Sequence, residues 1–484
     1  MGGGTAINWA CCLPLPENVR DEWSSEHGLV QFHSEAYQQS LQEVKSRIGY
    51  HYPEQHNAMN CKLRDGCAML GYARKNTGQN LRDTATAGFT CFGAPGKQSG
   101  IVTYLNDAVQ SGARILEKAH VQRVLTQMVD GRKRAVGIVA NVGDFRVQVN
   151  ARSCVIVAAG SLNTPCLLQR SGFRNPHIGR HLHLHPVTAA VGFFNDEIIH
   201  AYLGAPMTTV CNEFPNVKVE CPSAHTGLAA VVLPFRNPHD FKDKMLRLKH
   251  TAPLIVLQRD TVSEGRVRVG DDGFSPCIDY ELKKQEKLSM MNALKGAVKI
   301  LVASGASYVS TGHNDDPGLS LSDASFEDAA DIEYSDKIQN YLSSIDDRGM
   351  EKHKIGVFSA HQMSTCRMST SHEDGVVDEN GESWECDDLL IMDASIFPTA
   401  SGANPMLTTL TLSHMLSTRL VERMKMKERG QDDSTAGARE LEERTRKRAR
   451  QPKYDFNIWG WLIETGASTL VAVAVYYSLK NIFN

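Results

Sequence analysis

The chain has 484 residues, which is enough for two or three domains with substantial cores. Its 52 Lys and Arg residues nearly balance 55 Asp and Glu residues, and the net charge of -3 gives no field that would favour nucleic acid, so no nucleic-acid partner is expected. The 12 cysteines are scattered singly apart from Cys11 and Cys12, without the paired spacing of a zinc site, so no metal site is expected.

The region 99–172 has the pattern of an α/β unit, with a helix followed by strands. The predicted bounds are Val102–Ser111 for the helix and Ala113–Leu116, Val121–Thr126 and Ala135–Val142 for the strands. The next run, Ser153–Gly160 (SCVIVAAG), is continuously apolar and ends in glycine. That pattern is typical of a buried parallel strand that brings its carboxyl end to a ligand.

The character of the sequence changes after Pro186. Short strand-like runs with frequent Gly, Pro and Asn continue to about Tyr280, and an amphipathic helix is predicted near Leu282–Ser304. We therefore predict a separate, sheet-based substrate-binding domain over residues 185–358.

From Asp393 the chain returns to a tight turn, followed by a predicted helix over Pro405–Met424. The first turn of this helix would direct backbone N–H groups towards whatever lies beside Asn404. Because proline is common at the first helical position, a second role for Asn404 is that of a helix N-cap.

The C-terminal region divides into a charged part and an apolar part. Residues 425–453 include the basic run Arg444–Arg450 (RTRKRAR) and are predicted to form a solvated, partly helical linker. Ile458–Leu479 is 22 residues long and mostly apolar, and about 20 such residues span a bilayer. We therefore expect a single-pass membrane anchor over 454–484, with the main body kept on the cytoplasmic side. Glu464 would cost roughly 2.5 to 3.5 kcal/mol at mid-membrane, so an amphipathic or buried terminal helix is the alternative.

Four segments in chain order resemble one protein family. They are Gly2–Trp9 (GGGTAINW), Ala158–Gly172 (AAGSLNTPCLLQRSG) with Ile178–Pro186 (IGRHLHLHP) after it, Ser359–Met368 (SAHQMSTCRM) and Met392–Met406 (MDASIFPTASGANPM). The chain resembles the glucose-methanol-choline (GMC) oxidoreductases, and its HLHLHP and NPM forms are most similar to the long-chain fatty alcohol oxidase branch. The resemblance implies a mixed fold of α/β and antiparallel-sheet parts, with FAD as cofactor.

The N-terminal region departs from the family pattern. The branch normally begins with a strand, a GxGxxG-type turn and a helix that bind the ADP half of FAD, and no strand precedes Gly2, Gly3 and Gly4 here. We therefore expect an incomplete, Rossmann-like FAD-binding domain over 1–184 and a catalytic and FAD-binding segment over 359–424, in a chain that is either an incomplete gene model or a truncated product. His181 and Ser364 also differ from the residues common in the family.

The resemblance assigns catalysis to His361 and Asn404. Oxidation of an alcohol removes a hydroxyl proton and transfers a hydride, and a neutral imidazole suits the first step. His361 is the expected base, and Asn404 would hold the alkoxide oxygen so that the carbinol hydrogen faces the flavin. The alternative for His361 is a buried structural histidine.

The resemblance also implies cofactor contacts, each with a simpler alternative. Asn8 with Gly3 and Gly4 should contact the flavin, and the Val121 backbone should meet the adenine. Asp393 and Ala394 should lie near the ribityl chain or pyrophosphate, and Gly160 and Asn404 are also expected to contact the cofactor. On propensity alone, Val121 is a strand core residue, Asp393 closes a turn, and Gly160 with Ser161 forms a strand-to-helix turn. The alternating His181, His183 and His185 suggest a metal, but the run fits the family's flavin-side loop without one.

The expected function is FAD-dependent oxidation of a long-chain fatty alcohol to the aldehyde, with O2 as acceptor and H2O2 as product. The expected partners are the alcohol, O2 and, through the C-terminal helix, membrane lipid. The alternatives are a dehydrogenase, an oxidase of sterols or short alcohols, and a membrane-anchored pseudoenzyme that cannot hold FAD.

Overall fold

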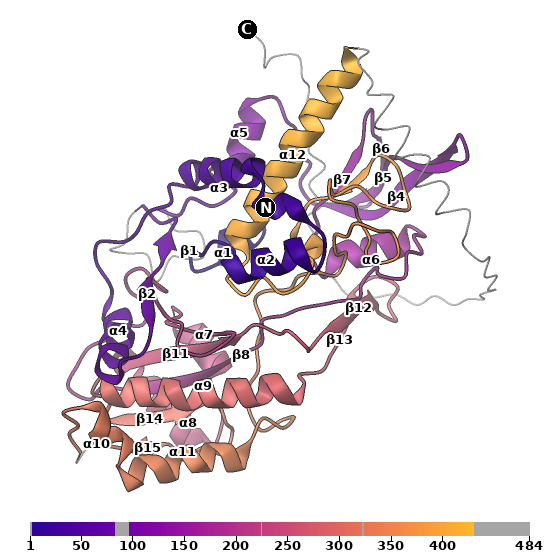
Figure 1. Ribbon diagram of the computed structural model, residues 1–484. Helices are drawn as coiled ribbons and strands as arrows, with labels where there is room; N and C mark the ends of the chain where they lie inside the picture. The colour runs from indigo at the N-terminus through magenta and orange to yellow at the C-terminus, as the bar shows by residue number, and fades with distance from the viewer. Residues whose placement is uncertain (1, 83–95, 224, 322–323, 430–484) are drawn as a thin grey trace.

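The computed structural model describes residues 2–82, 96–223, 225–321 and 324–429. These residues form two packed units that lie one below the other in Figure 1. The lower unit is built on an antiparallel sheet, and the upper unit combines a three-stranded sheet, a short parallel strand pair and the long helix α12.

The lower sheet has seven strands in the order β15-β14-β8-β11-β10-β9-β2. Its strands are β2 (Arg74–Asn76), β8 (Val187–Phe193), β9 (Thr209–Cys211), β10 (Val217–Glu220), β11 (Thr251–Gln258), β14 (Tyr308–Thr311) and β15 (Leu319–Ser320). The central strand β11 is mostly buried on both faces, because helices cover one side and the upper unit covers part of the other. Its near-continuous apolar sequence is what such a position requires.

Helix α9 (Lys284–Ala303) lies across this sheet and supplies much of its core. Helix α4 (Ala58–Leu70) packs against α9, and Gly66 allows the close approach, since a Cβ there would lie 2.2 Å from the Ile300 carbonyl oxygen. The remaining helices of this unit are α7 (Thr226–Val232), α8 (Pro238–Leu246), α10 (Ala329–Glu333), α11 (Asp336–Arg348) and the 3₁₀ turn η2 (Leu248–His250).

The upper unit contains the antiparallel sheet of β4 (Ala119–Val129), β5 (Arg132–Val142) and β6 (Phe145–Asn150). Strand β7 (Val155–Val157) pairs in parallel with β16 (Leu389–Ile391), so distant parts of the chain meet at one carboxyl edge. The helices are α1 (Gly4–Ile7), α2 (Glu17–Ser25), α3 (Glu35–Arg47), α5 (Tyr104–Gln110), α6 (Asn163–Arg170) and α12 (Met406–Glu428), with η1 (Val30–His33) and η3 (Ala394–Ile396). Two small antiparallel pairs complete the described fold: β1 (Cys11–Cys12) with β3 (Gly78–Gln79), and β12 (Gly265–Val269) with β13 (Pro276–Tyr280).

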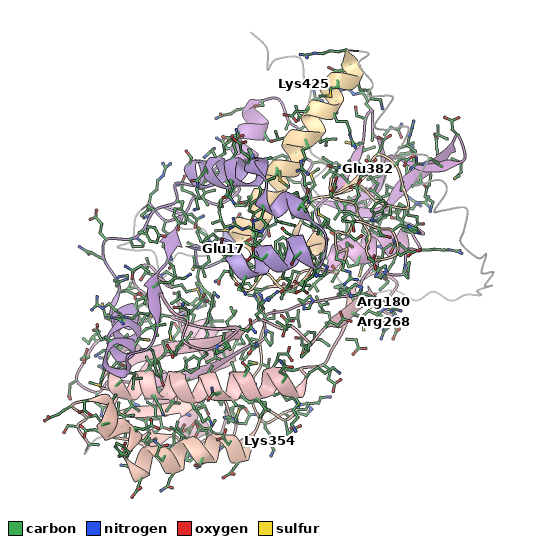
Figure 2. The ribbon with its side chains drawn as sticks, in the orientation of Figure 1. Glu17, Arg180, Arg268, Lys354, Glu382 and Lys425 are labelled. Atoms are coloured by element: carbon green, nitrogen blue, oxygen red, sulfur yellow. The ribbon has the colours of Figure 1, made fainter. Side chains whose placement is uncertain are left out.

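Side chains fill the space between these elements, and charged ends project outwards (Figure 2). Glu17 and Lys354 are exposed, and Lys425 lies in the last turn of α12. The apolar interior is divided accordingly into one large cluster around α9 and another around β7, β16 and α12.

Most predicted elements are confirmed, with small shifts of their ends. The predicted helices at 102–111, 282–304 and 405–424 correspond to α5, α9 and α12, and the apolar run 153–160 contains the parallel strand β7. The strand predicted over Ala113–Leu116 is wrong. The Ala113 N–H instead donates to the Ala108 carbonyl oxygen to close α5, after Gly112 turns the chain at φ +91°.

The two structural units do not follow the boundary predicted at residues 184 and 185. Strand β2 and helix α4 come from the region predicted as a partial FAD-binding domain, yet they join the lower sheet and its covering helix. The predicted substrate-binding region also contains helices α7 and α8 beside its strands.

Only the first residues of the predicted charged linker are described, as the end of α12. The predicted anchor over 454–484 lies outside the described residues. Among the helices of the described part, none is long and apolar enough to cross a bilayer.

Candidate active site

The predicted catalytic histidine is held by a second histidine. Backbone bonds between His183 and Met363 and between Val187 and Phe358 place the two segments side by side, with His185 opposite His361. The Nδ1 atoms of His185 and His361 lie 3.2 Å apart. The Gly402 N–H donates to His185 Nε2 at 3.1 Å.

These contacts fix the tautomers of both neutral rings. Because Gly402 donates to His185 Nε2, the hydrogen of that ring is on Nδ1 and is donated to His361 Nδ1. Neutral His361 therefore carries its hydrogen on Nε2. In this arrangement the free edge of His361 is a hydrogen-bond donor.

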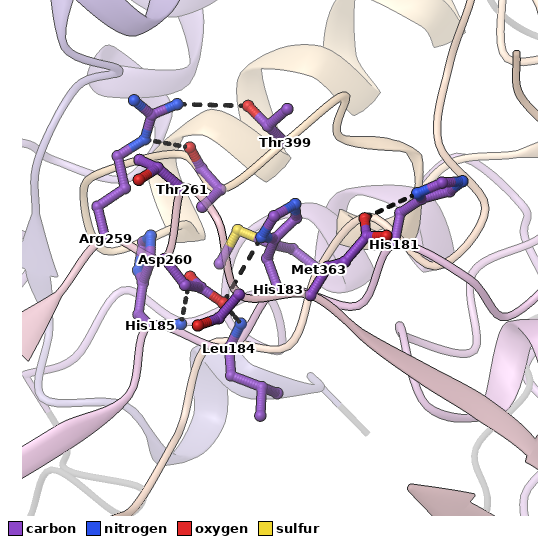
Figure 3. A network of polar contacts seen from close by, with 12 residues as sticks. His181, His183, Leu184, His185, Arg259, Asp260, Thr261, Met363 and Thr399 are labelled. Carbon is purple, nitrogen blue, oxygen red and sulfur yellow. Dashed lines mark hydrogen bonds and ion pairs between the residues drawn. The ribbon is translucent and has the colours of Figure 1, made fainter. Parts of the chain in front are cut away.

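His185 is held in turn by Asp260. Figure 3 shows the Asp260 carboxylate among Leu184, His185 and His183. It accepts the N–H groups of Leu184 and His185 at 2.8 and 3.1 Å and the Tyr280 hydroxyl at 2.9 Å, and it lies 3.5 Å from His183 Nδ1. These bonds support the left-handed backbone of His185, which has φ +47°.

Removal from water keeps the two rings neutral near pH 7, with His185 fully buried and His361 half-buried. Loss of water lowers the pKa of His361 to about 4, against a smaller opposite effect of the Asp260 charge. Burial also lowers the pKa of His185 well below its usual value, and the neighbouring His361 adds to this effect.

The amide of Asn404 lies at the start of α12, two residues after Gly402. Its Nδ2 is 3.4 Å from Glu220 Oε2 and 3.9 Å from the Met207 sulfur. Its Oδ1 is buried and has no hydrogen-bond partner among the described residues. The side chain makes no capping bond to α12, so its contacts do not match the alternative role of a helix cap.

Arg259 connects the loop that precedes Asn404, residues 399–403, to helix α2 of the N-terminal region. Its guanidinium is buried, donates to both Glu22 carboxylate oxygens at 2.8 Å, and donates to the Ala400 carbonyl at 2.8 Å. Figure 3 shows its contact with Thr399. The Thr399 hydroxyl also donates to Glu22 and accepts from Trp23. The loop that leads to Asn404 is thus held at several points.

Asn8 lies beside the first residue of α12. Its amide nitrogen is 2.8 Å from the Met406 sulfur, and its Oδ1 accepts the Ala10 N–H at 3.4 Å. Gly3 and Gly4 begin α1, and a Cβ on either would meet nothing within 4 Å. A flavin contact by these three residues stays a prediction.

Asp393 joins the β7 turn to the catalytic segment. Its carboxylate accepts the N–H groups of Gly160 and Ser395 at 2.9 and 2.8 Å and the Thr164 hydroxyl at 2.6 Å. The adjacent Ala394 carbonyl accepts the Ser364 N–H, three residues after His361. The contacts of Asp393 are those of a turn-closing residue, and its contact with FAD stays a prediction.

Val121 is a buried residue of β4, opposite Ala140 on β5. It packs in the cluster around β7 and α12, which agrees with the alternative of a strand core residue. Its predicted backbone contact with adenine is not tested by these contacts.

The three alternating histidines face three different partners. His181 contacts Glu264 at 3.0 Å and His177 at 2.9 Å, His183 faces Asp260, and His185 contacts His361. They therefore do not converge as a common set of metal ligands. In the described ranges, no group of three or more His, Cys, Asp or Glu side chains is placed to hold a metal ion.

The residues of the predicted cofactor side fit a dinucleotide. Gly160 lies in the turn after the parallel strand β7 at φ +80°, and a Cβ there would meet nothing within 4 Å, so there is space beside this turn although the Gly160 N–H is held by Asp393. Trp9 Nε1 and Ser161 Oγ are buried and have no hydrogen-bond partner among the described residues. Such unpaired groups are expected where a bound molecule completes the hydrogen bonding.

Family models described as GMC oxidoreductase match residues 1–187 and 261–413. The chain belongs to the GMC oxidoreductase family. The predicted cofactor, FAD, is that of this family.

Curated relatives of this GMC oxidoreductase include two long-chain-alcohol oxidases of Arabidopsis thaliana. FAO4A is 32% identical over 446 residues, covering 88% of this chain and 59% of its own length. FAO1 is 32% identical over 457 residues, covering 89% of this chain and 58% of its own length. The chain thus spans less than two thirds of the length of these relatives.

Solved structures share the GMC fold at lower identity. A variant of formate oxidase from Aspergillus oryzae, a structure that concerns FAD modification, has a TM-score of 0.62 and 14% identity, and the match covers 86% of this chain and 83% of that chain. The predicted mixed α/β and antiparallel architecture is confirmed, apart from the C-terminal hydrophobic helix.

Three residues around the site were not singled out by the sequence. The sequence indicated His185 only as part of the HLHLHP run, with a metal site as the alternative. Asp260 follows a buried strand, which is a weak signal. Glu220 ends the alternating segment VKVE, and this alternation predicts that its side chain faces solvent.

Proposed function

We propose that this chain oxidises a primary alcohol to an aldehyde with FAD as hydride acceptor. The observation that carries the proposal is the chain of contacts from His361 through His185 to Gly402, because it joins a neutral, largely desolvated imidazole to the loop that bears Asn404. An imidazole and an amide whose Oδ1 has no partner among the described residues suit the handling of a hydroxyl proton and its oxygen.

FAD, when bound, accepts the hydride from the carbinol carbon. The protein residues hold the substrate oxygen and manage its proton. In the described tautomer, His361 offers an Nε2–H that can bind this oxygen. For His361 to act as the base, both rings must adopt the opposite tautomer, and His185 then loses the bond from Gly402. The free energy of that lost hydrogen bond opposes the change of tautomer, so His185 influences how readily His361 can act as a base.

We propose a long-chain alcohol as the substrate and O2 as the electron acceptor, with H2O2 as product. The similarity to the Arabidopsis long-chain-alcohol oxidases supports this choice. The test is to incubate the FAD-loaded chain in air with primary alcohols of increasing length and to measure aldehyde and peroxide. Aldehyde without peroxide would indicate a dehydrogenase, and preference for sterols or short alcohols would change the substrate class.

A binding protein without catalysis is the competing proposal. It predicts that the purified chain retains no flavin after incubation with FAD, whereas the enzyme predicts visible flavin absorbance after gel filtration. This comparison needs no substrate, so it separates loss of the cofactor from loss of chemistry.

We also propose attachment to a membrane through the apolar sequence Ile458–Leu479, with the main body on the cytoplasmic side. The sequence alone supports this proposal. The test is to compare the full chain with a variant that ends at residue 453 in cells, after alkaline extraction. Release of both forms would contradict a spanning anchor.

A further inference from the structure

Glu220 is a buried carboxylate with too few hydrogen bonds for a structural role. It has no exposed surface and lies in the middle of the lower sheet, opposite Ile255 on β11 and Val210 on β9. Asn404 Nδ2, at 3.4 Å, is its recorded hydrogen-bond partner, and Oε1 has none among the described residues. Buried carboxylates normally receive several hydrogen bonds.

Glu286 shows how this chain satisfies a buried structural glutamate. It is 1% exposed and accepts the backbone N–H groups of Thr261, Val262 and Ser263 and the Ser263 hydroxyl. All four bonds come from one turn that wraps the carboxylate. Glu220 lacks such a turn and is directed instead at the amide of the predicted catalytic residue Asn404.

Asn404, like Glu220, has a buried oxygen without a hydrogen-bond partner among the described residues. Its amide nitrogen points at Glu220, and its Oδ1 is buried without a described partner. In this orientation, the end of the amide that does not face Glu220 is a hydrogen-bond acceptor. An acceptor is the wrong group to place beside a developing alkoxide, which needs a donor.

We propose that Glu220 is a positioning residue whose protonation state decides which end of the Asn404 amide faces the substrate oxygen. When ionised, Glu220 accepts from the Asn404 NH2 group, as described here. When protonated, its O–H donates to Asn404 Oδ1, the amide turns over, and the NH2 group faces the substrate. The two ends of an amide are nearly equal in size, so the reversal requires no extra space. This inference rests on the proposed alcohol oxidation.

The surroundings of Glu220 place its titration near neutral pH. Burial raises its pKa to about 7, against the opposing effects of Lys218 and of the Asn404 hydrogen bond. Lys218 faces the same side of β10, and the other titratable groups near the carboxylate are Cys11 from β1 and Cys221, which follows it in the chain. Lys218 acts on Glu220 through its charge, without a side-chain hydrogen bond between the two, so Lys218 does not lock either state.

The first test needs no cofactor. Infrared difference spectra of the purified full chain, taken between about pH 5 and about pH 9, follow the C=O stretch of protonated carboxyl groups. We expect a band that titrates near neutral pH in the wild type and in the matched control Glu286→Gln, and that is missing in Glu220→Gln. Asn404→Leu should move its midpoint to higher pH, because the carboxylate loses its donor. A Glu220→Gln spectrum that keeps the band, or an unchanged midpoint in Asn404→Leu, would overturn the coupling.

The second test uses the FAD-loaded chain and measures flavin reduction by an alcohol without oxygen. In the wild type the rate constant should fall by about tenfold or more as pH rises through the midpoint of Glu220, since one oxyanion donor contributes on the order of 100-fold. Glu220→Gln, whose NH2 group mimics the protonated acid, should hold the low-pH rate at all these pH values. A decline that persists in Glu220→Gln would refute the role of Glu220 while leaving alcohol oxidation in place. If no alcohol is oxidised, the proposed function fails, and the infrared titration still decides the coupling.

Discussion

The backbone N–H of Gly402 donates to Nε2 of His185 at 3.1 Å, and this one bond links the two halves of the candidate site. It sets the tautomer of His185, which sets the tautomer of His361 at 3.2 Å. It also ties the loop before Asn404 to the segment that crosses between the two units. Orientation and protonation of the predicted catalytic pair therefore depend on His185.

Replacing His185 by Phe should leave FAD bound but lower the rate constant of flavin reduction by about 100-fold, a typical cost of misplacing a reacting group by about 1 Å. The ring volume is kept while both nitrogen contacts are lost. The matched control is His181→Asn, since His181 belongs to the same run but faces Glu264. Equal rates for His185→Phe and the control would show that His185 is not needed to orient His361.

Glu220 should make the fold less stable as pH rises. Its pKa is raised from 4.5 to about 7 in the folded state, so the folded chain holds a proton that the unfolded chain has lost between these values. Stability should fall from pH 4.5 to pH 7 and stay low above it, by roughly 3 kcal/mol at most.

Thermal unfolding of Glu220→Gln checks this sign. The variant should match the wild type near the lower pH of that window and melt at a higher temperature above pH 7, since a neutral amide has no ionisation penalty. A variant that is less stable than the wild type above pH 7 would mean that the carboxylate is stabilised by groups other than Asn404.

The sequence predicted those parts of the fold that local patterns determine. The apolar run before Gly160 predicted β7, and the helical period over 282–304 predicted α9, because each pattern reflects burial of that element alone. The predicted strand at Ala113–Leu116 failed because hydrogen bonding at the end of α5 took its first N–H group.

The site was predicted less completely because its contacts join distant residues. His185 and His361 are 176 positions apart, and Glu220 and Asn404 are 184 positions apart. No local pattern distinguishes a glutamate in an alternating strand that faces solvent from one that faces a buried amide. Family motifs located His361 and Asn404, but they did not point to the residues that hold them.

Arg259 and Glu22 should behave as a coupled pair. Arg259→Leu should lower the free energy of unfolding by roughly 3 kcal/mol, because it leaves a partly buried carboxylate without its partner and frees the Ala400 carbonyl. The double variant with Glu22→Leu should recover part of this loss. Denaturant titration of the four chains gives the coupling energy, and strict additivity would show that the pair is not a stabilising unit.

His361 should make the fold sensitive to acid. Its pKa falls from 6.5 to about 4 on folding. Between these pH values the imidazole is therefore protonated in the unfolded chain and neutral in the folded chain. Stability should be unaffected above pH 6.5 and should decrease as pH falls towards 4, by roughly 1 to 3 kcal/mol. His361→Asn should lessen this decrease when melting is compared at pH values inside and above the window, and an unchanged acid profile would argue against burial of the ring.

The most direct measurement of the central claim is anaerobic mixing of the FAD-loaded chain with a long-chain primary alcohol while the visible absorbance of the flavin is recorded. We predict that the absorbance bleaches in the wild type, and that His361→Ala retains the flavin but bleaches at least 100-fold more slowly, on the order expected for loss of general acid–base catalysis. A wild-type chain that holds no flavin or does not bleach, or a His361→Ala variant that bleaches at the wild-type rate, would contradict alcohol oxidation at this site.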